Sequence, residues 1–233
     1  MDLARPQIDV GLFTHNKLQP MQAFYGDKLG LKFESVMPVG GGFRQHRYLC
    51  NGSVIKLMDS REPLRPRRPG GYETLMLAMP ATTQAEALAD PDDNTIEVVP
   101  PGRDDVNQIE IRVGVSDVGE FGEFYTSAFG AVSIGHDRYR IGETIFGVYH
   151  EPEIHRPKLA PFANPLEVVQ AMAELGIQYV TVQVRNCDAA FEALKAAGAA
   201  VAVPPANFGT VARICFVRDP DGNFIEIAQR PPA

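Results

Sequence analysis

The chain has 233 residues, of which 45% are hydrophobic and 22% are charged, and its formal net charge is −7. This composition is ordinary for a folded protein and suffices for one large or two small cores, whereas the negative charge disfavours nucleic acid as a partner. The three cysteines have no C-x-x-C spacing and predict neither a disulfide framework nor a thiolate zinc site. Because the sequence has no stretch of roughly 20 apolar residues and no signal-peptide pattern, we expect a soluble cytoplasmic protein without a membrane partner.

The first predicted unit covers residues 8–59. We expect a strand at residues 8–13, then a helix that ends at Gly30, because glycine readily adopts the left-handed conformation that closes a helix. A new strand should follow this glycine at once, and two further strands should meet at Asn51-Gly52, a typical two-residue hairpin turn. The unit therefore has the predicted order β-α-β-β-β.

The second unit is shorter. It begins with a strand at residues 72–77, continues with a predicted helix at residues 81–89 and ends with a strand at residues 95–99. The Asp-Pro-Asp-Asp-Asn segment before the last strand is rich in residues that form turns with their own backbone.

The third unit repeats the first, with a strand at residues 109–113, a helix that ends at Gly130 and a hairpin at Gly142-Glu143. An additional helix is expected at residues 165–175, where the starting proline is well tolerated.

The fourth unit repeats the second, with a strand at residues 179–184, a helix at residues 188–197 and a strand at residues 224–228. Residues 90–99 and 219–228 match without a gap and are identical at six of ten positions. Each copy ends in an apolar strand that carries one carboxylate on the opposite face from its apolar neighbours. Fused repeats are therefore predicted.

These segments resemble the vicinal oxygen chelate superfamily, which includes glyoxalases, extradiol dioxygenases, antibiotic-resistance proteins and several isomerases. The most specific matches are FVRDPDGNFIEIAQR at residues 216–230 and the FYxxxLG pattern at residues 24–30, which residues 124–130 nearly repeat. The resemblance covers nearly the whole chain and implies an α+β fold. In that fold, four βαβββ-type modules, the second one shortened, pair into two curved mixed β-sheet domains that enclose clefts. We predict these domains at residues 1–103 and 104–233.

The family usually holds a divalent metal between residues of the first and last strands of its modules. The resemblance places the first-strand ligand, usually His, at Asp9, Tyr72, Glu110 and Tyr179. It places the last-strand ligand, usually Glu, at Lys56, Glu97, Phe146 and Glu226. If consecutive modules pair, one cleft contains Asp9, Lys56, Tyr72 and Glu97, and the other contains Glu110, Phe146, Tyr179 and Glu226.

Two chemistries follow for the second of these clefts. Two close carboxylates, Glu110 and Glu226, cannot both ionise cheaply. Either a divalent cation neutralises them, with Mg or Mn better suited than Zn to oxygen ligands and Fe or Ni as further alternatives, or one stays protonated and the pair acts as acid and base. Tyr179 would then stabilise an enolate by donating a hydrogen bond.

In the other cleft, Lys56 can neutralise Asp9 or Glu97, so these residues and Tyr72 are predicted to be structural or to contact a substrate, as is Phe146 in the second cleft. The histidines are weaker candidates. His46 and His136 are predicted on exposed strands, and His150 and His155 lie in a proline-rich loop without a metal-binding spacing.

The leading functional hypothesis is an isomerase or lyase of the glyoxalase type that moves a proton in a small carbonyl-containing or aromatic molecule, with Glu226, Glu110 and Tyr179 as catalytic residues. The first alternative is a resistance-type protein that binds and sequesters a small molecule. The second is an extradiol-type dioxygenase, for which the two histidines that Fe(II) usually requires are missing. A monomer and a homodimer are both compatible with four modules in one chain.

Overall fold

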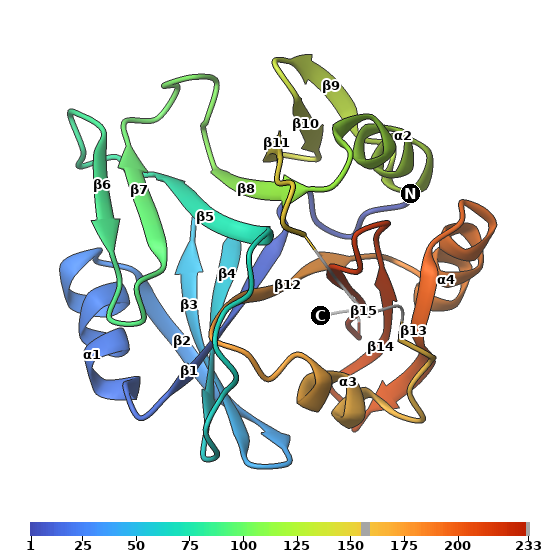
Figure 1. Cartoon of the computed structure of the whole chain (residues 1–233). Helices are drawn as coiled ribbons and strands as arrows, with labels where there is room; N and C mark the ends of the chain where they lie inside the picture. Colours follow the sequence, from blue (N-terminus) through green and yellow to red (C-terminus); the bar gives the residue numbers. More distant parts are fainter. Residues whose placement is uncertain (155–158, 232–233) are drawn as a thin grey trace.

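The computed structural model describes residues 1–154 and 159–231, which form two curved mixed β-sheets with helices at their ends (Figure 1). Across the first sheet, the eight strands are in the order β13 (Ala200–Phe208), β14 (Ala212–Arg218), β15 (Phe224–Gln229), β12 (Gly176–Gln183), β1 (Asp9–His15), β4 (Ser53–Ser60), β3 (Phe43–Cys50) and β2 (Lys32–Gly40). Across the second, the seven strands are in the order β6 (Glu86–Ala89), β7 (Thr95–Val99), β5 (Gly71–Ala78), β8 (Ile109–Val115), β11 (Thr144–His150), β10 (Arg138–Ile141) and β9 (Val132–Gly135). The predicted α+β fold with two curved mixed sheets is confirmed.

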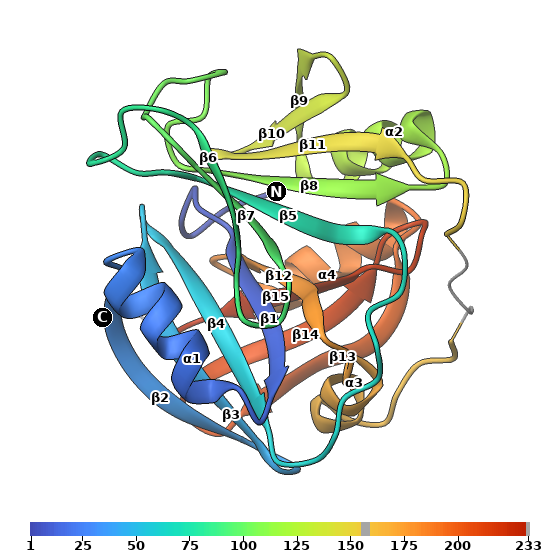
Figure 2. The same ribbon diagram turned by 60° about the vertical axis from the view of Figure 1, so that its left-hand side comes forward.

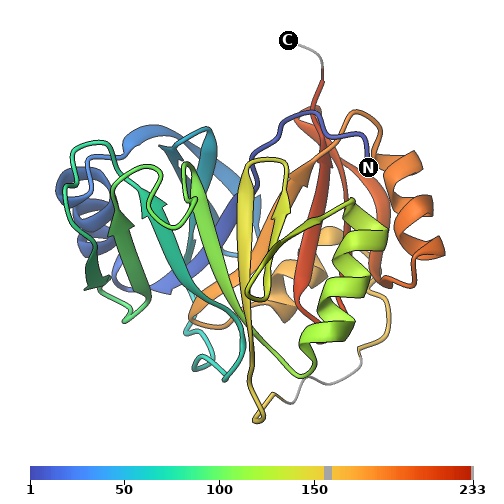
Figure 3. The ribbon, with the colours of Figure 1, turned by 90° about the horizontal axis from the view of Figure 1, so that it is seen from above.

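The helices in the described residues are α1 (Leu18–Gln22) with its π-helical continuation η1 (Ala23–Lys28), α2 (Val118–Phe129), α3 (Pro165–Ala171) and α4 (Cys187–Ala196). Helices α2 and α4 lie side by side at one end of the molecule, and α1 lies at the other end (Figure 3). Gly130 ends α2 with a φ of 71°, as the sequence predicts. None of these helices is long and apolar enough to cross a membrane.

The two sheets do not pair consecutive units of the sequence. In the first sheet, β1 pairs with β12, so residues 8–59 join residues 177–229. In the second sheet, β5 pairs with β8 and joins the two middle units. The consecutive pairing considered from the sequence is therefore wrong, and each sheet contains strands from both sides of residue 103. Figure 2 shows the sheets one above the other, with blue and orange strands together in the lower one.

The two Asp-Pro-Asp turns have the same hydrogen bonds. The Asp90 carboxylate accepts from the backbone and side chain of Asn94, and Asp219 accepts in the same way from Asn223. A buried tyrosine from the preceding helical segment donates to each carboxylate: Tyr25 to Asp90 at 2.9 Å and Tyr125 to Asp219 at 3.2 Å. Each turn thereby fixes the start of the strand that carries the predicted carboxylate.

The helix predicted at residues 81–89 is wrong. The second half of this segment is strand β6, which pairs with β7 from Glu86 opposite Val98 to Ala89 opposite Thr95. Its residues have good helix propensity, but pairing at the edge of a sheet overrides a weak local preference.

The largest core cluster combines residues of both sheets and of the helices, among them Leu12, Leu57, Leu77, Ile111 and Tyr125. A second cluster lies on the other face of the first sheet and includes Phe13, Met58 and Phe216. Because side chains alternate between the faces of a strand, β1 contributes Leu12 to one cluster and Phe13 to the other. This second cluster surrounds the site described next.

Candidate functional site

The first sheet curves around a cavity with an empty volume of about 700 Å³, open solvent at its mouth included. Apolar lining side chains come from five strands and from α3, and include Met37, Met58, Leu166, Val169, Ile214 and Phe216. The polar lining residues are Gln45, Arg47, Lys56, Tyr179, Thr181, Gln183, Glu226 and Arg230. An apolar pocket with a few convergent polar groups is the usual form of a small-molecule site.

Helix α3 closes one side of this cavity. It begins sharply because the Asn164 side chain accepts a hydrogen bond from the backbone N–H of Glu167, and Pro165 occupies the first turn. This start directs Leu166 and Val169 toward the strands. The helix predicted at residues 165–175 is therefore present over the first part of that range.

An ion pair lies on the floor of the cavity. The Lys56 Nζ donates to Glu226 Oε2 at 2.9 Å and to Thr181 Oγ1 at 2.5 Å, and the Thr181 hydroxyl donates in turn to the same Glu226 oxygen. The three residues come from β4, β12 and β15, which the sheet order places close together. Lys56 is 3% exposed, so its charge is separated from bulk water.

Burial alone would raise the pKa of Glu226, but the Lys56 ammonium and the Thr181 hydroxyl outweigh it and lower the pKa below its usual range. Glu226 is therefore an ionised carboxylate. Both donors contact Oε2, and no hydrogen bond from the described residues reaches Oε1.

Tyr179 adds a phenol to the same cavity. Its hydroxyl accepts from Gln45 at 3.2 Å and faces the Met58 sulfur at 3.6 Å, while its ring lies 5.3 Å from the Lys56 ammonium. The ring crosses directly over Gly11, where a Cβ atom would overlap it. Burial and the nearby Glu226 charge raise the pKa of Tyr179 well above its usual value, so the phenol is a hydrogen-bond donor.

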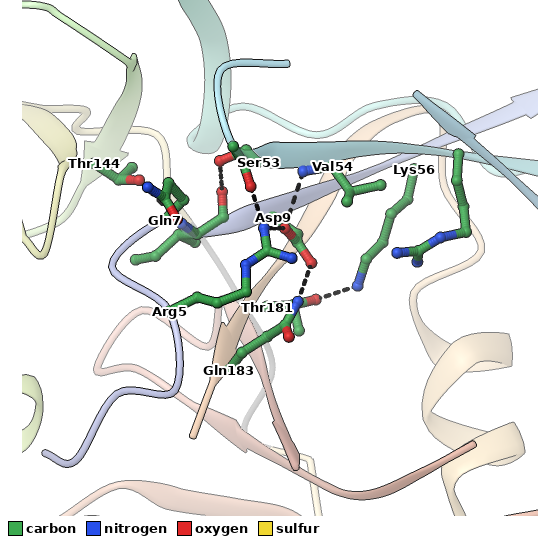
Figure 4. A network of polar contacts seen from close by, with 12 residues as sticks. Arg5, Gln7, Asp9, Ser53, Val54, Lys56, Thr144, Thr181 and Gln183 are labelled. Carbon is green, nitrogen blue, oxygen red and sulfur yellow. Dashed lines mark hydrogen bonds and ion pairs between the residues drawn. The ribbon is translucent and has the colours of Figure 1, made fainter. Parts of the chain in front are cut away.

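Asp9 is fully buried beside the cavity floor, and Figure 4 shows its polar contacts next to the Lys56–Thr181 hydrogen bond. It accepts from the backbone N–H of Val54 at 2.9 Å and from the Gln183 side chain at 3.0 Å, and Arg5 lies 3.6 Å away. Asp9 is therefore neutralised by Arg5, and not by Lys56 as one of the sequence hypotheses has it.

The second sheet holds the other two predicted carboxylates. Arg112 pairs with Glu97 at 2.8 Å and lies 3.8 Å from Glu110, which also pairs with Arg138 at 2.5 Å. The remaining predicted residues, Tyr72 and Phe146, are 3% and 0% exposed and belong to the largest core cluster.

The predicted pair of Glu110 and Glu226 is not formed, because these residues lie in different sheets. Glu97 is likewise not the partner of Lys56. Of the predicted residues, the structure brings Lys56, Tyr179 and Glu226 into one cavity and leaves Asp9 beside it. Sequence reasoning missed Thr181, although the shared Y-x-T pattern could have indicated it, and missed Gln45 and Arg47, which no motif indicates.

The donor set does not fit the divalent metal that the family usually holds. Of the family positions in the first sheet, Asp9 is already paired with Arg5 and Lys56 offers an ammonium without a lone pair. In the second sheet, the Arg112 guanidinium lies between the two carboxylates. Within the described part of the chain, no cluster of three or more His, Cys, Asp or Glu residues could hold a metal ion. In both sheets, a basic side chain contacts the carboxylate at a family ligand position.

None of the histidines in the described residues lines this cavity. His46 is buried and its Nδ1 contacts Gln22, so its predicted exposure is wrong. His136 lies in the exposed turn between β9 and β10, not on a strand, and His150 ends β11. His155 lies outside the described residues.

Comparison with known proteins identifies the family. Residues 105–227 match the model of the Glyoxalase/Bleomycin resistance protein/Dioxygenase superfamily, and the chain belongs to this superfamily. The resemblance to the vicinal oxygen chelate superfamily is thereby confirmed. No curated protein matches the sequence.

Solved structures with the same fold include glyoxalase I from Zea mays, at 11% identity and a TM-score of 0.67, with 96% of this chain and 92% of that chain covered. A putative dioxygenase from Bacillus subtilis has 12% identity and a TM-score of 0.67, with 99% and 87% covered. The cppA protein from Streptococcus pneumoniae has 12% identity and a TM-score of 0.56, with 98% of both chains covered. At these identities, the similarity concerns the fold alone.

Proposed function

We propose that this protein binds a small organic molecule in the cavity of the first sheet without a metal ion. The observation that carries the proposal is the Lys56–Glu226 ion pair on the cavity floor, where a lysine stands at a position that the family uses for a metal ligand. The apolar walls would enclose the body of the ligand, and the polar floor would orient it. Binding and sequestration are favoured over proton transfer, because a carboxylate with a lowered pKa is a weak general base.

Prodan, a neutral naphthalene ketone whose fluorescence shifts to the blue in an apolar site, is a suitable probe. In buffer with a chelator, we expect saturable binding to the wild-type protein. Leu166→Trp places an indole in the mouth of the cavity and should abolish binding. Val132→Trp introduces the same side chain at an exposed position of the second sheet and should leave binding unchanged. Equal binding by wild type and Leu166→Trp, with both variants folded by circular dichroism, would overturn the proposal.

A proton-transfer enzyme is the second candidate. The specific observation in its favour is that Glu226 is fixed through Oε2, while Oε1 has no hydrogen bond from the described residues. Such a carboxylate can accept a proton from a molecule in the cavity. Exchange of α-protons for deuterium in small ketones, followed by NMR, tests this candidate: exchange by the wild type that Glu226→Gln lacks supports it, and the absence of exchange contradicts it.

A further inference from the structure

We infer that the ligand of this cavity is a monoanion, with a carboxylate group on a compact apolar body. The inference rests on the proposed function, because it names the ligand class of the same cavity. Three features of the lining carry it: its charge, a phenol without a strong acceptor, and the shape of the apolar walls.

The charge of the lining is opposite to that of the protein. Arg47, Lys56 and Arg230 line the cavity, and Glu226 is the one carboxylate among its described lining residues. The chain as a whole has a net charge of −7. A basic pocket in an acidic protein attracts small anions, because the local charges dominate the potential inside a cleft with low-dielectric walls.

Within this lining, Glu226 neutralises Lys56 at 2.9 Å. Arg47 pairs with Glu34 at 2.5 Å, and Glu34 is not among the lining residues. Arg230 is an exposed residue at the cavity mouth that makes no ion pair among the described residues, and its charge reaches Glu226 only as the weakest of the interactions that lower the pKa of that carboxylate. A bound anion would therefore leave the Lys56–Glu226 ion pair intact, and the Arg230 guanidinium would neutralise its charge.

Arg47 and Lys56 also stand directly opposite each other on the paired strands β3 and β4. Like charges at such positions destabilise a sheet. Glu34 and Glu226 offset this repulsion from the two sides. An anion between the two cations would reduce it further, and a cationic ligand would increase it.

The Tyr179 phenol provides a donor for an anionic oxygen. The Tyr179 hydroxyl donates to the Met58 thioether, with 3.6 Å between the oxygen and the sulfur, and a thioether is a weak acceptor. Gln45 holds the hydroxyl by donating to it at 3.2 Å. A carboxylate oxygen would replace the sulfur as acceptor and form a stronger, charge-assisted hydrogen bond.

The apolar walls limit the rest of the ligand. Side chains from strands on both sides of the cavity, such as Met37 and Ile214, face the space that Leu166 and Val169 of α3 close. These residues offer no hydrogen bond, so the ligand body should be apolar and small enough for one or two rings.

Competition with prodan tests the inference. The competitors are benzoate, 3-phenylpropanoate and 2-naphthoate, each compared with its primary amide, which has nearly the same shape and no charge. We expect at least one carboxylate to displace prodan about tenfold more strongly than its amide at low salt, and the ratio should fall as salt screens the charge. Arg230→Gln should weaken carboxylate binding about fivefold, in line with a partly exposed charge contact, and leave amide binding unchanged. Arg140→Gln, the same change at an exposed residue of the second sheet, should have no effect.

The outcomes separate the two proposals. If prodan binds in the cavity but the amides compete as well as the carboxylates, or no carboxylate competes, the anion inference is overturned and the proposed function stands. If Leu166→Trp fails to affect prodan, both are overturned. Equal carboxylate affinity in wild type and Arg230→Gln at low salt also contradicts the inference, because the charge selectivity then does not come from the cavity mouth.

Discussion

The Lys56–Glu226 pair shows what a single residue changes at a position that the family uses for a metal ligand. Lys56 belongs to the chain itself, and its ammonium group neutralises the Glu226 carboxylate without an ion from solution. The second sheet reaches a similar result with Arg112 beside Glu97 and Glu110. Glu226 and Glu97 thus occupy equivalent places in the two matching segments, and each has a basic partner from another strand.

Removing the cation should therefore leave the part-buried Glu226 carboxylate with the Thr181 hydroxyl as its remaining partner among those described above and without a counter-charge from Lys56. Lys56→Met, which nearly preserves side-chain volume, is expected to lower the free energy of unfolding by about 3 kcal/mol at pH 7, as for other broken buried pairs. The double variant Lys56→Met/Glu226→Gln should recover most of this loss. Urea denaturation of the wild type, both single variants and the double variant measures the coupling.

The difference in unfolding free energy between the wild type and Lys56→Met depends on pH. The pKa of Glu226 is lowered in the folded protein, so its ion pair contributes stability above the unfolded pKa of about 4.3 and loses this contribution as the pH falls through the folded value. The difference between wild type and Lys56→Met should therefore be largest at neutral pH and shrink in acid. A difference that stays constant down to the acid limit of the fold would show that Lys56 acts through packing and not through charge.

At the scale of single elements, the backbone of β1 lies directly against the Tyr179 ring. This close contact is possible because residue 11 is a glycine and has no Cβ atom. A methyl group on Gly11 would overlap the ring, which other aromatic side chains hold in place, among them Phe13 and Phe216. Gly11→Ala should therefore destabilise the protein by about 1–3 kcal/mol, as overpacking generally does, and displace the phenol from the cavity.

Gly26→Ala is the matched control. A Cβ at Gly26 would lie 3.4 Å from the Tyr48 ring, which is an ordinary contact, and alanine is the better helix former in η1. Thermal unfolding of the two variants should give opposite signs. A Gly11→Ala variant as stable as the wild type, with unchanged prodan affinity, would disprove the steric role of Gly11.

Local patterns predict most of the elements and fewer of their contacts. The strands that begin at Ile109 and Phe224 and the helix end at Gly130 follow from side-chain alternation and glycine placement. The predicted helix at residues 81–89 fails because its strand β6 is specified by pairing with β7 and not by its own residues. Such patterns do not predict the partners of Lys56 and Glu110. The partners of Lys56 lie on strands more than a hundred residues away in the sequence, and the partners of Glu110 depend on how the strands of the second sheet are arranged.

At the scale of the whole molecule, the two sheets make the halves of the chain interdependent. The central pairs β1–β12 and β5–β8 both join strands from opposite sides of residue 103. The site depends on the same arrangement, since Lys56 comes from the first half and Thr181 and Glu226 come from the second. The sequence prediction of domains at residues 1–103 and 104–233 can therefore be tested directly by asking whether either part folds alone.

We expect that it does not. A chain divided between Arg103 and Asp104 would give two fragments, each with strands of both sheets but without the central partner strands that cover their edges and apolar faces. Each fragment alone should lack a cooperative thermal transition. The two fragments together should form a one-to-one complex with the circular dichroism spectrum of the intact chain and with prodan affinity restored, because the Lys56–Glu226 pair forms only when both are present. A cooperative transition in either isolated fragment would instead show that residues 1–103 and 104–233 are independent domains.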